Sequence, residues 1–178
     1  MRYVVLDVET TGLSPGCGDR VVEVGAVAVA EGAVIAEFTS LVNAGREIPR
    51  RAEQADGPSD AIPAGEPSPQ IVFSALRHFI GESTLISHDA LSGLALLRHE
   101  FGRLGFGLPD RHVCTLELAR RYLPQLPDHR LETVALHLFG EVPSATRSHR
   151  TLADARLTAR VWEAFTARHA AIFTADNR

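Results

Sequence analysis

The stretch Tyr3-Val4-Val5-Leu6-Asp7-Val8-Glu9-Thr10-Thr11-Gly12-Leu13 joins an apolar run to two carboxylates near the start of the chain. The apolar run predicts a β-strand, and side chains alternate between the two faces of a strand. Asp7 and Glu9 therefore point the same way, with Val8 on the opposite face. Neighbouring carboxylates repel each other, and a divalent cation would remove that repulsion. The alternative is an edge strand with a solvated acidic face.

The residues after Glu9 give the predicted strand a tight exit. Gly12 lets the backbone approach a ligand closely, and the two threonines offer hydroxyl and amide groups. We therefore expect this exit to contact a substrate through Thr10, Thr11, Gly12 and Leu13. The end of the first strand is a candidate active site.

Length and composition favour one soluble α/β domain that covers residues 1–178. The chain has 178 residues, of which 45% are hydrophobic, which is ordinary for a globular core. It lacks a run of about 18 uncharged apolar residues, and its start does not resemble a signal peptide. These features predict a cytoplasmic protein without a membrane partner. Cys17 and Cys114 have no metal-ligand spacing and are expected to be reduced thiols.

The charge of the chain argues against a broad nucleic-acid-binding surface. All 18 basic residues are arginine, and the net charge is −4. A nucleic-acid substrate would therefore have to be held locally. Arginines concentrate in the second half, where a solvated helix face is the alternative explanation. They are Arg111, Arg120, Arg121, Arg130, Arg147, Arg150, Arg156 and Arg160.

Apolar spacing and the positions of Gly and Pro predict the order of the elements. Strands over 20–30 and 33–42, joined by a Glu31-Gly32 hairpin, form a meander with the first strand. Strands and helices then alternate, which favours a central mixed sheet of about five strands flanked by helices. The later strands are predicted at 83–87 and 111–114, and the helices at 69–79, 90–104, 115–123, 131–138 and 151–167.

Two further segments have distinct patterns. Residues 43–69 are rich in Pro, Gly and Ala, which predicts a functional loop with at most a short helix. The last helix carries apolar residues at helical spacing, which predicts one buried stripe. This stripe comprises Leu152, Ala155, Ala159, Trp162 and Phe165.

The segment Ser148-His149-Arg150-Thr151-Leu152-Ala153-Asp154 is a second candidate constellation. His149 and Asp154 would point in different directions within one helix, so they converge only if His149 belongs to the incoming loop. Beside the first acidic pair, they would complete a site that binds two divalent cations and deprotonates a water for in-line attack on phosphorus. The alternative is ordinary helix capping by Thr151 and Asp154.

The two constellations together resemble the first and third motifs of DEDDh-type 3′-to-5′ exonucleases, and most closely the epsilon-like proofreading subunits of bacterial DNA polymerase III. The motifs are Asp7-x-Glu9-Thr10-Thr11-Gly12 and His149-x4-Asp154. Further similar stretches are Ile48-Pro49, Leu85-Ile86-Ser87-His88, Leu96-Leu97-Arg98-His99-Glu100-Phe101 and Thr115-Leu116-Glu117-Leu118-Ala119-Arg120-Arg121.

The resemblance implies an RNase H-like fold and two Mg²⁺ or Mn²⁺ ions. It implies Asp7, Glu9 and Asp154 as metal ligands and His149 as the general base. His88, in the second motif, joins the expected substrate contacts. The implied partners are the 3′ end of single-stranded DNA or RNA and a polymerase subunit.

The second motif departs from its usual form. Relatives carry His-Asn-x-x-x-Asp at the start of the middle helix, where this chain has His88-Asp89-Ala90-Leu91-Ser92-Gly93. Gly93 replaces an acid that helps to hold the second metal, so the second metal site is weakened. Asp89 lies one helical turn earlier and is either a further metal ligand or a helix cap.

The irregular loop contains another departure. Relatives often carry a His-Gly pair whose histidine contacts the substrate nucleotide, and this chain has Asp56-Gly57 instead. An acid repels a phosphate unless a metal ion or an arginine intervenes. We therefore expect weaker substrate binding as well as slower catalysis.

Two functional hypotheses follow. The first is a metal-dependent exonuclease that removes nucleotides from the 3′ end of a single strand, with DNA favoured, and releases nucleoside 5′-monophosphates. The second is a catalytically degenerate protein of the same fold that binds nucleic-acid ends or a polymerase partner without cleaving. A plain structural domain with coincidental acids is a third reading.

Overall fold

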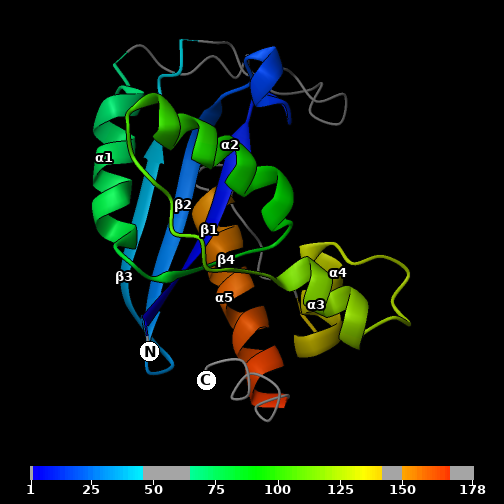
Figure 1. Cartoon of the computed structure of the whole chain (residues 1–178). Helices are drawn as coiled ribbons and strands as arrows, with labels where there is room; N and C mark the ends of the chain where they lie inside the picture. The colour runs from blue at the N-terminus through cyan, green and yellow to red at the C-terminus, as the bar shows by residue number, and fades with distance from the viewer. Residues whose placement is uncertain (1, 46–64, 142–149, 169–178) are drawn as a thin grey trace.

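The computed structural model describes residues 2–45, 65–141 and 150–168 (Figure 1). Within these residues, five strands form one sheet in the order β3-β2-β1-β4-β5. The first three strands are an antiparallel meander, and β4 and β5 run parallel to β1. The strands are β1 (Arg2–Thr10), β2 (Val21–Ala30), β3 (Ala33–Leu41), β4 (Thr84–Ser87) and β5 (His112–Cys114). The predicted mixed sheet is confirmed.

The hairpin between β2 and β3 has the predicted two-residue turn. Ala30 pairs with Ala33, so Glu31 and Gly32 alone form the connection. Both have positive φ, 54° and 76°, which gives the turn a twist that matches the flanking strands.

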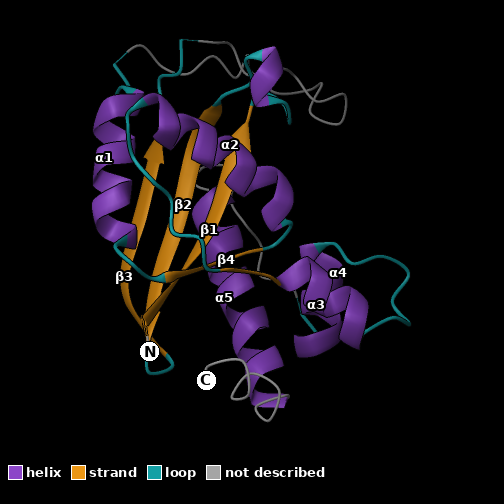
Figure 2. Ribbon diagram, in the orientation of Figure 1, coloured by secondary structure: helices purple, strands orange, loops and turns teal. Residues whose placement is uncertain are grey.

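Helices cover both faces of the sheet. Figure 2 shows α1 and α2 in front of the strands and α5 behind them. Buried residues of α1 and α2 pack against Val4 and Leu6 of β1, whereas α5 packs against Val5 of the same strand. The helices are α1 (Pro69–Ile80), α2 (Ala90–Arg103), α3 (Thr115–Tyr122), α4 (Leu131–Phe139) and α5 (Arg150–Arg168), and a 3-10 turn, η1, spans Pro15–Cys17.

Helix α5 buries two faces rather than one stripe. Leu152, Ala155 and Ala159 pack on the sheet. Phe165, predicted in that stripe, belongs instead to a cluster that α5 forms with α3 and α4. The prediction of one stripe was wrong because α3 and α4 cover a second side of α5, which the helical period alone does not indicate.

The remaining predictions concern the two cysteines, membrane-spanning helices and the loop over 43–69. Cys17 and Cys114 are both unpaired, as predicted. Among the described residues, no helix has the length and apolar character needed to cross a membrane. Most of the predicted loop over 43–69, including Asp56-Gly57, lies outside the described residues.

Candidate active site

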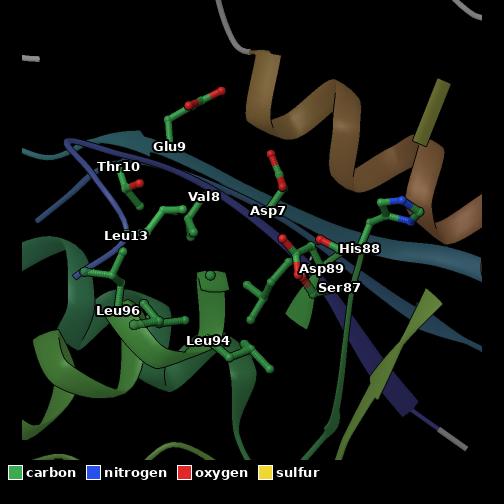
Figure 3. Close-up of a pocket in the computed structure, with 13 residues that line it drawn as sticks. Asp7, Val8, Glu9, Thr10, Leu13, Ser87, His88, Asp89, Leu94 and Leu96 are labelled. Atoms are coloured by element: carbon green, nitrogen blue, oxygen red, sulfur yellow. Dashed lines mark hydrogen bonds between the residues drawn. The ribbon is translucent and has the colours of Figure 1, made fainter. Parts of the chain in front are cut away.

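A cleft of about 150 Å³ lies where β1 and β4 end, at the edge of the sheet next to α2. Figure 3 shows Asp7 and Glu9 on the side of β1 that faces α5, and Val8 on the side that faces α2. We call this cleft the acidic cleft. Its lining residues are Leu6, Asp7, Val8, Glu9, Thr10, Leu13, Ser87, His88, Asp89, Gly93, Leu94, Leu96 and Leu97.

Helix α5 reaches the acidic pair because β2 has a glycine at the crossing point. Gly25 pairs with Asp7 across the sheet. A Cβ at Gly25 would overlap the backbone of Thr151 and Leu152, so only glycine allows α5 to approach this closely. Asp154, the fifth described residue of α5, is thereby brought next to Asp7.

A hydrogen bond fixes the start of α5 on the sheet. The buried Thr151 hydroxyl donates to Glu23 Oε1 over 2.7 Å. Glu23 pairs with Glu9 across the two strands, and the register shifts by one residue between Glu9 and Thr10. Such a β-bulge bends the strand and changes the direction of the side chains that follow it. The β-bulge therefore bends β1 directly after Glu9, next to the two carboxylates.

The carboxylates perturb one another. Burial raises the pKa of Asp7 well above its usual range, and the negative charges of Asp154 and Glu9 add to this shift. Burial also raises the pKa of Asp154, although Arg150 opposes the change. Arg150 Nε lies 3.5 Å from Asp154 Oδ2, and its Nη2 lies 3.8 Å from Glu132. The cleft therefore favours either protons or a cation beside these carboxylates.

The donor set fits Mg²⁺ or Mn²⁺, since both ions bind carboxylate oxygens. Asp7, Glu9 and Asp154 provide such oxygens on two neighbouring elements. Within the described ranges, however, no three His, Cys, Asp or Glu side chains converge closely enough to form a ready metal site. The negative carboxylates repel each other, and the ion pair with Arg150 competes for the Asp154 carboxylate. A bound cation would oppose both effects.

The exit of β1 is held by hydrogen bonds within the protein. Thr11 is buried, and its hydroxyl accepts from Arg20 N over 3.0 Å and approaches Asp19 Oδ1 at 3.4 Å. The space that a Cβ at Gly12 would need is occupied by the Asp19 carboxylate. A Cβ at position 12 would therefore displace the Asp19 carboxylate. Thr11 and Gly12 have contacts within the protein, and their predicted contact with a substrate stays a prediction.

A buried ion pair anchors this exit to α2. Arg20 Nε and Nη2 donate to the two Glu100 carboxylate oxygens over 2.5 and 2.9 Å. The Glu100 side chain is only 1% exposed. Arg20 Nη1 also donates to the Ala44 carbonyl over 3.1 Å. The interactions of Arg20 therefore join three segments that lie far apart in the sequence.

Leu13 and Thr10 differ from Thr11 and Gly12 in their position at the cleft. Both line the acidic cleft. Leu13 is 68% exposed, so its side chain is open to contact a ligand. These two residues are the members of the predicted substrate set that remain available at the surface of the cleft.

His88 is held by the protein on both sides of its ring. Nδ1 lies 2.9 Å from the Thr115 hydroxyl, and Nε2 lies 2.8 Å from the His129 carbonyl. Burial lowers the pKa of His88, so the neutral ring donates from Nε2 and accepts at Nδ1. His88 also lines the acidic cleft, and its role in substrate binding stays a prediction.

The second-motif residues Asp89 and Gly93 both line the acidic cleft. Asp89 is the residue before α2, with φ of 61°, and its side chain makes no capping hydrogen bond. The capping alternative for Asp89 is thus not supported. Gly93 lines the acidic cleft, and a Cβ at this position would lie 3.2 Å from Val8 Cγ2. A Cβ at position 93 would therefore fit if Val8 shifted by a few tenths of an ångström.

Some site residues were not identified from the sequence. Gly25 and Glu23 position α5, and Glu100 holds the exit of β1. Gly25 stands alone in a valine-rich strand, and an isolated glycine there is a signal of close backbone approach. His149 precedes the first described residue of α5 and lies outside the described residues. That His149 belongs to the loop before this helix therefore stays a prediction.

Two sequence comparisons identify related proteins. Residues 4–162 match the RNase_T family model, which describes exonucleases. The chain is 31% identical over 160 residues to the 3′-5′ exonuclease DinG of Bacillus subtilis, a match that covers 88% of this chain and 17% of that protein. It is 34% identical over 157 residues to DNA polymerase III PolC-type of Bacillus cereus, with coverage of 88% and 11%. The chain thus spans a small part of each relative.

A solved structure shares the fold. Exonuclease X, in complex with 5′ overhanging duplex DNA, superposes with a TM-score of 0.67 at 23% identity, covering 94% of this chain and 93% of that chain. The five-stranded mixed sheet with helices on both faces is the RNase H-like arrangement that the motifs implied. With its two motifs inside the matched region, this chain belongs to the exonuclease family.

Proposed function

We propose that this protein is a metal-dependent 3′-to-5′ exonuclease that hydrolyses phosphodiester bonds at the end of a single strand. One observation carries the proposal: α5, seated on Gly25, brings Asp154 beside Asp7 and Glu9 at the end of β1. The exonuclease family supports nuclease chemistry. The name of the DinG relative supports the 3′-to-5′ direction.

Each proposed role follows from residue chemistry. Asp7, Glu9 and Asp154 would hold Mg²⁺ or Mn²⁺, with Asp89 as an additional ligand. Bound ions of this kind lower the pKa of water and stabilise negative charge on phosphate oxygens. His149 would take the proton of the attacking water, a role that suits an imidazole near neutral pH.

The proposed substrate is the 3′ end of a single strand, with DNA favoured over RNA. Relatives include a DNA polymerase, and exonuclease X was solved with DNA. Thr10 and Leu13 would contact the terminal nucleotide, Leu13 through its exposed side chain. The PolC-type relative carries the matching region within a much longer chain, which supports a polymerase as the partner of this protein.

A second candidate is a degenerate member of the family that binds nucleic-acid ends without cleaving them. Gly93 favours it, because the acidic cleft lacks a carboxylate at that position. With fewer anionic ligands, the second metal would bind weakly. Asp89 could compensate in part from one turn earlier.

Cleavage assays with three proteins separate the candidates. Wild-type protein, Asp7→Ala and Gly93→Asp are incubated with 5′-labelled single-stranded DNA or RNA and with Mn²⁺ or Mg²⁺. An active exonuclease gives a ladder that shortens from the 3′ end, and Asp7→Ala removes it. Mn²⁺ should support faster cleavage than Mg²⁺, since it binds a ligand-poor site more tightly.

Three outcomes of these assays distinguish an active exonuclease from a degenerate member of the family. Activity that needs Asp7 and does not rise in Gly93→Asp supports a working variant site. Activity that arises only in Gly93→Asp supports the degenerate member. Wild-type protein and Gly93→Asp that both leave every strand intact would refute the exonuclease proposal.

A further inference from the structure

A second groove continues from the acidic cleft. It has a volume of about 510 Å³ and shares His88 and Asp89 with the acidic cleft. We call it the arginine groove. Its lining residues are His88, Asp89, Leu116, Arg120, Asp128, His129, Arg130 and Leu131, from the end of β4, from α3 and from the segment that enters α4.

The floor of the arginine groove is held in place by histidines. The His88 ring bridges α3 and the segment before α4 through its bonds to Thr115 and His129. His129 Nε2 lies 3.1 Å from the Leu123 carbonyl, so this ring is also engaged. These hydrogen bonds hold the end of β4, α3 and the segment before α4 together beneath the groove.

The positive charge of the groove comes from two arginines. Arg120 lies in the last turn of α3, and Arg130 is the residue before α4; both are exposed. In the described part of the chain, neither guanidinium forms a salt bridge, unlike those of Arg77 and Arg156. The charge of Arg130 acts on Asp128 without forming a salt bridge, and a guanidinium outside a salt bridge can present its planar donors to a phosphate.

The acids of the groove are already engaged. Asp128 accepts hydrogen bonds from the Thr133 side chain and the Arg130 backbone N–H, which lower the pKa of Asp128. Asp89 also lines the acidic cleft, where the proposed function assigns it to a cation. A cation bound at Asp89 would offset the charge of that carboxylate, whereas Asp128 keeps its negative charge.

We propose that the arginine groove binds the phosphate backbone of the single strand on the 5′ side of its terminal nucleotide, with Arg120 and Arg130 as the phosphate contacts. The inference rests on the proposed function, which places the 3′ end in the acidic cleft. A cleft of about 150 Å³ cannot contain a longer strand, so the nucleotides that follow must lie beyond it. The protein carries a net charge of −4, so these nucleotides need local positive charges, which Arg120 and Arg130 provide in this groove.

Binding measurements test this assignment. Fluorescence anisotropy would give the Kd of labelled thymidine trinucleotide and dodecanucleotide, with Ca²⁺ replacing the catalytic ion and NaCl varied from about 50 to 200 mM. The variants are Arg120→Gln, Arg130→Gln and the double variant. Arg121→Gln is the matched control, because Arg121 follows Arg120 on α3 but stacks on Tyr122 outside the groove.

The expected result is specific to the longer strand. Each single variant should bind the dodecanucleotide about fivefold more weakly, and each lost contact should lower the slope of log Kd against log salt by about 0.7. Binding of thymidine 5′-monophosphate and the melting temperature should not change, because both arginines are exposed. Arg121→Gln should behave as the wild type.

Other outcomes separate this inference from the proposed function. A double variant with unchanged Kd and salt slope would overturn the groove assignment and leave the exonuclease proposal intact. Wild-type protein that binds through these arginines but cleaves nothing would support the groove and point to the degenerate member. Wild-type protein that binds no oligonucleotide would overturn the assignment.

Discussion

The two walls of the acidic cleft differ in how completely they are built. On the wall formed by β1 and α5, Asp7 and Asp154 are brought together by contacts that only Gly25 and the Thr151 to Glu23 hydrogen bond allow. On the wall formed by α2, Gly93 faces Val8 and leaves an apolar surface.

The β1 and α5 wall keeps its acidic residues, whereas the α2 wall lacks one. Burying carboxylates side by side destabilises a protein, and the β1 and α5 wall retains them together with the residues that position them. The α2 wall lacks one acid, although a Cβ at position 93 would require only a small shift of Val8. Three of the four carboxylate positions can therefore be tested as a functional unit.

The largest expected effect is the loss of cleavage in Asp7→Asn. We expect initial rates with Mn²⁺ to fall about a thousandfold, which corresponds to about 4 kcal/mol of activation free energy, because a charged ligand is lost at the centre of the acidic pair. Initial rates on 5′-labelled single-stranded DNA measure it. Asp110→Asn, which removes an exposed carboxylate before β5, is the control. Activity above a tenth of the wild-type rate in Asp7→Asn would show that the reaction occurs elsewhere.

The next effect concerns the ion pair that joins the two walls. Glu100→Gln leaves Arg20 without its buried partner, and we expect the free energy of unfolding to fall by about 3 kcal/mol. Urea denaturation measures the change. The side chains of Arg20 and Glu100 are 12% and 1% exposed.

A surface ion pair provides the matched comparison. Glu82 pairs with Arg77 over 2.8 Å, but its side chain is 85% exposed. Glu82→Gln should therefore change the free energy of unfolding by less than about 1 kcal/mol. Equal effects of Glu100→Gln and Glu82→Gln would mean that the pair of Arg20 and Glu100 does not anchor the exit of β1.

Local sequence patterns were sufficient for most of the fold. Alternation in β1 and β2, the Glu31-Gly32 turn and the helical spacing of α1 and α2 depend on neighbouring residues, so they could be read from the sequence. The resemblance of the two motifs then predicted which acids would meet. It could do so because the fold, rather than the local pattern, brings Asp154 to Asp7.

Contacts between distant residues could not be predicted in this way. Glu100 lies within the predicted helix over 90–104, and its partner Arg20 lies 80 residues away in sequence. Thr11 and His88 carry polar groups that suit a substrate, but tertiary neighbours satisfy them. A sequence indicates the chemistry of a side chain and not which group will use it.

A smaller effect is the pH dependence of the metal-free protein. Folding raises the pKa values of Asp7 and Asp154, so above about pH 4 the folded protein binds more protons than the unfolded chain. Its stability should therefore fall as the pH rises from about 4 through the raised pKa values. In EDTA, Asp7→Asn should melt about 3 °C or more above the wild type at pH 8, with the difference shrinking toward pH 4.

The melting curves also report on cation binding. Mn²⁺ should stabilise the wild type at pH 8 more than Asp7→Asn, because it replaces the protons that the carboxylates otherwise favour. Asp110→Asn should follow the wild type at every pH. A melting difference between Asp7→Asn and wild type that stays constant from pH 4 to pH 8 would contradict the coupling between Asp7 and Asp154.

The smallest expected effect is at Leu13, on the rim of the β1 wall. Leu13→Ala should raise the Kd for a single-stranded trinucleotide about fivefold, or about 1 kcal/mol, because the exposed side chain loses apolar contact with the terminal nucleotide. Its melting temperature should stay unchanged, since the side chain is already 68% exposed. Leu136→Ala is the control, because Leu136 is 54% exposed on α4 and does not line the acidic cleft. If Leu13→Ala and Leu136→Ala bind the trinucleotide equally well, the β1 wall holds the cation only, and the α2 wall must supply the contacts to the terminal nucleotide.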